Sequence, residues 1–227
     1  MGRMHKAALL PLIFVAACAG HDPRVEAEQL VKPPRLEPVR AALPGAAAPT
    51  LAANEALTWL ERGADATEDI CGMHAEVHKG FFPNQVWRVS CDWETTRYYG
   101  FDGDFAERTQ AVNDALVAAG WPKSDEALSA AIRYFKQTHK PDYDASHVPP
   151  VVYGKYIGDQ SWTVRLSWAE AGRVPPELSA TRAPRDPLHR EAAEVDREQV
   201  YRDLTSRHQF VLVHSVSARY FERTIAG

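Results

Sequence analysis

The sequence predicts an α+β fold built on one antiparallel sheet that carries helices on one face. Three observations lead to this prediction. Residues 86–101 alternate between apolar and polar side chains, which is typical of a strand with one buried face. Two amphipathic helical patterns follow, at 104–120 and 124–140. Residues 151–157 and 162–168 are then predicted to be strands joined by the turn-forming pair Gly158-Asp159.

The strand over 86–101 is predicted to place its tryptophans on the buried side. The apolar positions are Trp87, Val89, Cys91 and Trp93, and the polar positions are Arg88, Ser90, Asp92 and Glu94. Because successive side chains of a strand point to opposite faces, Cys91 is expected on the buried face. A buried cysteine there suits a core disulfide better than a reactive thiol.

Both helical patterns carry start and stop signals. Asp104, with Glu107 three residues on, has the spacing of a capping box at the start of the first helix, and Gly120 ends that helix. The second helix begins at Ser124 and ends before Pro141. Each helix is amphipathic and is therefore expected to lay one side on the sheet.

The remaining pattern completes the predicted sheet. Residues 169–187 indicate an exposed Pro- and Arg-rich loop, 194–208 a helix and 210–221 a last strand. The order from residue 86 is strand, helix, helix, strand, strand, helix, strand. Without the extra helix at 124–140 this is the split βαβ, ferredoxin-like order, in which 86–101 lies beside 162–168 and 210–221 flanks 86–101. A cystatin-like or other α+β sandwich is the alternative.

The segment before residue 86 has weaker patterns. Asn54 is a plausible N-cap for a short helix that ends at Gly63. A short strand is predicted over 72–79. The globular domain is accordingly expected to span 51–227.

The first residues have the layout of a secretory signal peptide. Arg3 and Lys6 precede an apolar run that is too short to span a bilayer, and small residues follow it. The next stretch, Val15-Ala16-Ala17-Cys18, resembles the lipobox of bacterial lipoproteins. The resemblance implies cleavage before Cys18, residues 1–17 as signal peptide, diacylglycerol on the Cys18 sulfur and localisation at the cell membrane. The alternative is an ordinary signal with a chance cysteine. Two acyl chains anchor a protein stably, whereas one binds a membrane only marginally.

Residues 18–50 are predicted to form a Pro/Ala-rich tether between the lipid and the domain. Such a segment cannot bury enough apolar surface to offset the entropy lost on ordering. The alternative is a short helix over 25–36 that ends at the double proline. The prolines are Pro23, Pro33, Pro34, Pro38, Pro44 and Pro49.

Two cysteines remain once Cys18 is assigned to lipid. In an oxidising compartment Cys71 and Cys91 are expected to form a disulfide. The alternative is a metal site in which His74 and His78 join the two thiolates, although this spacing matches no common zinc finger. The aspartates near 102 and 142 lack the twelve-residue loop of a calcium-binding hand. No metal and no cofactor is expected.

Charge and motifs narrow the function. Removing Arg3 and Lys6 with the signal leaves 24 basic against 30 acidic side chains, a net charge of −6, which argues against a nucleic-acid partner. The sequence has no G-x-S-x-G motif and no phosphate-binding or dinucleotide-binding glycine loop. No catalytic residue is therefore assigned.

The polar face of the sheet is the expected interaction surface. Arg88, Asp92 and Glu94 are predicted to lie on it together with Arg165, and arginine is suited to carboxylate and phosphate groups. The alternative is that these arginines merely pair with the acids across strands.

The expected function is that of a non-enzymatic envelope module that binds an unknown envelope protein or an anionic ligand. In layout and in its Ala/Arg/Pro-rich composition the chain resembles small uncharacterised surface lipoproteins of high-GC Gram-positive bacteria. A lipid-anchored hydrolase whose site is assembled from distant residues is one alternative, and a small-ligand carrier is another.

Overall fold

The computed structural model describes residues 22–226 except residue 33 and the segments 78–84, 139–147 and 172–186. The signal peptide, Cys18 and His78 lie outside the described residues. In the described part, six strands form one sheet and five helices surround it, so the α+β prediction is confirmed. No helix within the described ranges is long and apolar enough to cross a bilayer.

Every strand pair in the sheet is antiparallel, in the order β3-β4-β6-β2-β1-β5. The ferredoxin-like order is not found, because β6 lies between β2 and β4 where that order requires β2 and β4 to be neighbours. The other edge of β2 is occupied by β1 along its whole length, which leaves β2 with only one further partner. The strands are β1 Glu61–Val77, β2 Gln85–Phe101, β3 Val151–Ile157, β4 Gln160–Glu170, β5 His189–Ala193 and β6 Phe210–Ala226.

The first strand is much longer than the short strand predicted over 72–79. In its first half the side that faces the helices carries Asp65, Thr67 and Asp69, so the apolar alternation that identifies a half-buried strand is missing. On the side that faces the helices, Asp69 is buried, and its carboxylate is paired inside the protein. Because a buried residue such as Asp69 is polar, the sequence pattern did not indicate this half of β1.

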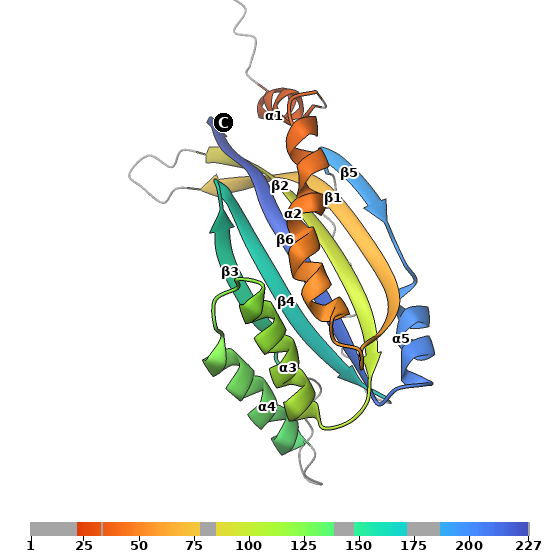
Figure 1. The fold of residues 1–227 in the computed structure, drawn as a ribbon. Coiled ribbons are helices and arrows are strands. Elements are labelled where there is room, and N and C mark those ends of the chain that lie inside the picture. Colours follow the sequence, from red (N-terminus) through yellow and green to blue (C-terminus); the bar gives the residue numbers. More distant parts are fainter. Residues whose placement is uncertain (1–21, 33, 78–84, 139–147, 172–186, 227) are drawn as a thin grey trace, which may run out of the picture.

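The N-terminal segment is helical. α1 (Pro23–Val31) and α2 (Glu37–Glu55) pack on the sheet, and α2 runs along the middle of one face (Figure 1). The predicted tether over 18–50 is therefore wrong for the residues that the structure describes, and α1 is close to the alternative of a short helix. Asn54 is not an N-cap but a buried residue in the last turn of α2.

Helix α2 forms despite two internal prolines. Pro44 and Pro49 are exposed, so neither ring displaces a core side chain. Residues at helical spacing on the other side are buried against the sheet, and that burial stabilises a helix whose intrinsic propensity is poor. The buried stripe consists of Arg40, Leu43, Ala47, Thr50, Leu51 and Asn54.

The other helices lie where their apolar faces require. α3 (Phe105–Ala118) begins as predicted, with the Asp104 side chain accepting from the backbone N–H of Glu107. α4 (Asp125–Thr138) packs beside it through Phe105 and Phe135, whose ring centroids are 3.9 Å apart. Together α1 to α4 cover one face of the sheet and enclose the main core.

The fifth helix corrects the prediction that all helices lie on one face. α5 (Arg197–Thr205) packs on the opposite side, where Tyr201 and Leu204 form a second cluster with Tyr98, Val211 and Val213. This helix covers one end of that face. The rest of the face carries polar side chains and is called the open face below.

Candidate functional site

The predicted disulfide is present and buried. Cys71 of β1 and Cys91 of β2 lie directly opposite each other in the strand register, with a Cα–Cα distance of 4.0 Å, and their sulfurs are bonded. Sulfurs joined in this way are not available as thiolate ligands. His74 is exposed and pairs with Arg88 on the open face, away from the sulfurs. Within the described residues no group of three or more His, Cys, Asp or Glu side chains is arranged to hold a metal ion.

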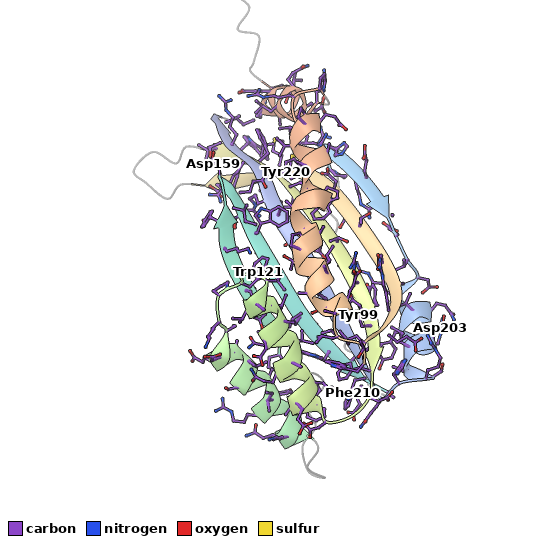
Figure 2. All side chains as sticks on the ribbon, in the orientation of Figure 1. Tyr99, Trp121, Asp159, Asp203, Phe210 and Tyr220 are labelled. Carbon is purple, nitrogen blue, oxygen red and sulfur yellow. A yellow bond between two sulfur atoms is a disulfide. The ribbon has the colours of Figure 1, made fainter. Side chains whose placement is uncertain are left out.

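A buried polar cluster lies beside the disulfide, under the N-terminal half of α2 (Figure 2). Arg40 Nε is 3.1 Å from Asp69 Oδ2 and donates to the Tyr220 hydroxyl at 2.9 Å. Its Nη2 donates to Cys71 Sγ at 3.3 Å. The Tyr220 hydroxyl donates to Asp69 Oδ1 at 2.6 Å. One arginine thus ties α2 to β1, to β6 and to the disulfide.

A bulge in β6 directs Tyr220 into this cluster. Cys91 pairs with Phe221 and Asp92 pairs with Arg219, so Tyr220 is the extra residue on the β6 side. Burial, followed by the hydrogen bond to Asp69, raises the pKa of Tyr220 well above its ordinary value of 10. The hydroxyl therefore remains protonated as a donor. The cluster is fully engaged in structural contacts.

His214 is a core residue and not a catalytic base. Its Nδ1 lies 2.9 Å from Asn54 Nδ2, and desolvation lowers the pKa of the imidazole to about 3. The adjacent Ser215 is on the open face, where its hydroxyl lies 2.8 Å from that of Thr96. Because neighbouring strand residues point to opposite faces, the imidazole and the hydroxyl cannot act together.

The four residues predicted to form an interaction surface all lie on the open face, but they are not one cluster. β6 separates Arg88, Asp92 and Glu94 of β2 from Arg165 of β4. Three of the four have partners nearby. Arg88 pairs with Glu76 at 2.9 Å and with Glu222 at 3.5 Å, Asp92 accepts from Arg219 at 2.9 Å, and Glu94 accepts from the Thr96 hydroxyl at 2.9 Å.

Arg165 differs from Arg88 and Arg219, which are both paired with carboxylates. It is exposed, and its Nε lies 3.4 Å from the Ser167 hydroxyl. Among the residues that the structure describes, no carboxylate forms an ion pair with it. The two terminal nitrogens of its guanidinium therefore have no described partner.

The neighbours of Arg165 on this face are hydroxyl side chains, apart from Val152, its partner on β3. We call the set formed by Ser161, Thr163, Ser167, Ser215 and Ser217 the hydroxyl patch. On the edge strand β3 next to this patch, Tyr156 is 78% exposed and pairs with Ser161. Sequence reasoning missed Tyr156 and Ser161, because a lone exposed aromatic residue in a short strand gives no local signal of a surface.

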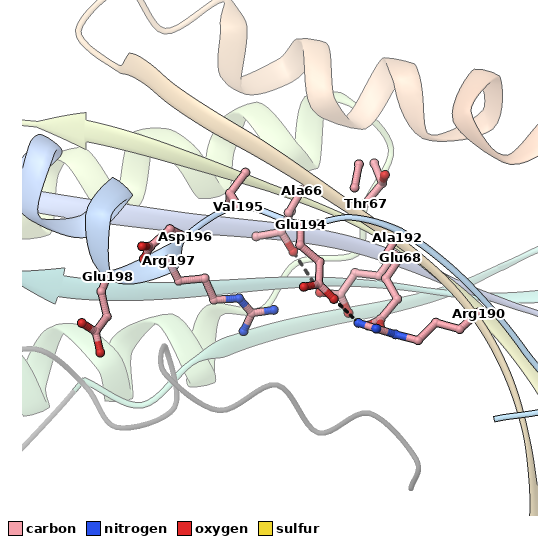
Figure 3. Close-up of a pocket in the computed structure, with 13 residues that line it drawn as sticks. Ala66, Thr67, Glu68, Arg190, Ala192, Glu194, Val195, Asp196, Arg197 and Glu198 are labelled. Carbon is pink, nitrogen blue, oxygen red and sulfur yellow. Dashed lines mark hydrogen bonds and ion pairs between the residues drawn. The ribbon is translucent and has the colours of Figure 1, made fainter. Parts of the chain in front are cut away.

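A shallow pocket of about 350 Å³ lies at the other end of the open face, between β5, β1 and the start of α5 (Figure 3). Arg190 occupies it and bonds to Glu68 at 2.8 Å and to Glu194. The guanidinium of Arg197 extends from the beginning of α5 along the pocket. Acids outnumber arginines in the lining, so the pocket is acidic overall. Its further acidic and hydroxyl residues are Thr67, Glu94, Thr96, Asp196 and Glu198.

The open face therefore has two chemically different halves. Over β1, β2 and β5 the face carries many acids, several of them paired with arginines, whereas the half over β3 and β4 combines hydroxyls with Arg165. Comparisons of this chain with protein-family models, with curated proteins and with solved structures find no match.

Proposed function

We propose that this chain is a lipid-anchored extracytoplasmic module that binds an anionic envelope component on the open face of its sheet. The observation that carries the proposal is Arg165, an exposed guanidinium without an acidic partner among the described residues. Arginine is suited to this role because its planar fork matches carboxylate and phosphate oxygens.

The charge distribution of the open face supports an anionic partner at this position. The side chains that β3 and β4 contribute to it include no carboxylate. The nearest acids belong to β2, and there Asp92 is held by Arg219 while Glu94 accepts from Thr96. A partner that approaches Arg165 over β3 and β4 would therefore meet hydroxyls, one positive charge and the exposed Val152 and Tyr156, but no negative charge from these strands.

The proposed extracytoplasmic location and lipid anchor are supported by the lipobox-like stretch and by the disulfide. A disulfide persists in an oxidising compartment and is rare in the cytosol. Replacing Cys18 with Ala is expected to abolish acylation and to move the protein from the detergent phase to the aqueous phase. Unchanged palmitate labelling of that variant would contradict the lipid anchor.

The binding role is tested by retention on isolated cell envelopes. Arg165→Ala is expected to lower retention about tenfold, since hydrogen bonds to charged groups contribute about 1.5–3 kcal/mol. Arg202→Ala is the matched control, because Arg202 is exposed on α5 and its guanidinium contacts Glu198 and Gln199 within that helix. High salt is expected to weaken retention of the wild-type protein.

Undiminished retention of a folded Arg165→Ala variant would rule out this half of the open face. Equal losses in Arg165→Ala and Arg202→Ala would indicate only a general charge effect. Both variants change exposed side chains, so unchanged melting temperatures are expected for each.

A further inference from the structure

We infer that the partner of the open face is a glycan strand that bears carboxylates. The inference rests on the proposed function and specifies the chemical class of the ligand. Three features of the described residues support it: the row arrangement of the hydroxyl patch, the exposed ring of Tyr156 and the free end of the Arg165 guanidinium.

The strand register places these groups in three successive rows across the sheet. Tyr156 pairs with Ser161 in the first row, Gly154 lies beside Thr163 in the second, and Arg165 stands next to Ser215 in the third. Arg165 follows Ser161 by four residues, a separation of about 13 Å along β4 at about 3.3 Å per residue. An elongated ligand can reach both ends, whereas a single small ion cannot.

The middle row is low because it contains no large side chain over β3 and β4. A side chain added at Gly154 would find no atom within 4 Å of its Cβ, so the space above this residue is open. Thr163 and Ser217 continue the same row across the sheet. We call this low middle row, between Tyr156 in the first row and Val152 and Arg165 in the third, the trough.

The side chains along the trough match the groups of a sugar. Serine and threonine hydroxyls both donate and accept, as sugar hydroxyls do, so each can pair in either direction. The exposed ring of Tyr156 offers a flat apolar surface to the C–H face of a pyranose, with a polar hydroxyl at its tip. A peptide partner would favour apolar pockets or a wider charged surface, whereas the described open-face residues of β3 and β4 offer only the exposed Val152 and one cation.

The carboxylate on the proposed ligand is inferred from the hydrogen bonding of Arg165. Its Nε faces the Ser167 hydroxyl, and the two terminal nitrogens, which have no partner among the described residues, can present parallel N–H groups. That pair fits the two oxygens of one carboxylate. A polymer with a phosphate on every unit would bring several charges to a trough that has only one unpaired cation among its described residues.

The experiment measures binding of the full-length protein, purified in mild detergent, to three probes by calorimetry. The probes are oligogalacturonate, its methyl-esterified form and polyglutamate. The wild-type protein is expected to bind oligogalacturonate at least tenfold more tightly than either of the others. Tight binding of polyglutamate would instead indicate an anionic peptide, and equal binding of the methyl ester would show that the carboxylate is irrelevant.

Two variants locate the site. Arg165→Ala and Gly154→Leu are each expected to weaken oligogalacturonate binding at least tenfold, the first by removing the cation and the second by filling the trough. The Cβ of a residue at position 154 would meet no atom within 4 Å, so the melting temperature of Gly154→Leu should not fall. Arg202→Ala is expected to bind like wild type. Unchanged binding in the folded Gly154→Leu variant would overturn the inference that the ligand binds in the trough.

The two proposals fail in different ways. If envelope retention depends on Arg165 but oligogalacturonate does not bind, the glycan inference is wrong and the binding role stands. If envelope retention does not depend on Arg165, the proposed function is wrong whatever the glycan result.

Discussion

Replacing the buried Arg40 tests how much its ion pair with Asp69 stabilises the packing of α2 on the sheet. The side chains of Arg40 and Asp69 are only 8% and 11% exposed, and the ion pair between them is 3.1 Å long. Replacing Arg40 with Met keeps most of the apolar stem but leaves the Asp69 carboxylate buried without its cation. Breaking a buried pair in this way costs about 3–5 kcal/mol. The hydrogen bond from Tyr220 remains, so we expect about 3 kcal/mol.

The partner variants separate charge from packing. Asp69→Asn alone leaves the guanidinium without its carboxylate and is expected to cost a similar amount. In the double variant neither charge is left unpaired, so its loss should be clearly smaller than the sum of the two single losses. Arg24→Met on α1 is the control, because Arg24 forms an exposed i,i+4 pair with Glu28 that is worth less than about 0.5 kcal/mol.

The measurement is urea unfolding at pH 7 with the disulfide intact, followed by linear extrapolation to water. A loss below about 1 kcal/mol for Arg40→Met would refute the reasoning, as would a double variant that loses the full sum of the single losses. Either result would mean that the buried Asp69 carboxylate does not need the charge of Arg40 for the protein to be stable.

Three further predictions concern stability. A protein that begins at Leu51 lacks α1 and most of α2, so it should lose cooperative unfolding; a transition equal to that of the whole protein would show that these helices are dispensable. His214 has a folded pKa of about 3 against 6.5 unfolded, so between these values only the unfolded chain binds the proton. The stabilisation is therefore full above pH 6.5 and falls by about 5 kcal/mol on acidification to pH 3. His214→Gln should flatten this slope, and an unchanged slope would assign it to other groups. Replacing Cys71 and Cys91 with Ser should cost roughly 3 kcal/mol in urea unfolding, and no loss would contradict the entropic account of a 20-residue loop.

Several elements could be predicted because their signals are local. The alternation over β2 reflects one buried face, and the pair Asp104 and Glu107 marks the start of α3 within a single turn. The turn at Gly158 joins β3 to β4, and this glycine has the positive φ of 59° that such a turn favours. The disulfide could be predicted from the expected oxidising compartment and from the even number of cysteines that remain after Cys18.

Other features depend on contacts between distant parts of the chain. Helix α2 contains two prolines and is formed because its stripe is buried on a sheet that starts after it in the sequence. The first half of β1 carries polar residues on its buried side, and Asp69 can be buried there because Arg40 of α2 pairs with it. No local pattern carries either of these relationships.

The fold class, most helix and strand positions, the cysteine pair and the face of β2 that carries its charges could all be predicted from the amino-acid order. The place of β6 between β2 and β4, which sets the charges that meet on the open face, could not. Strand alternation specifies the face of a residue but not its neighbour, because any antiparallel partner satisfies the same pattern. That insertion gives Asp92 its partner Arg219 and leaves Arg165 among hydroxyls, with no acidic partner among the described residues.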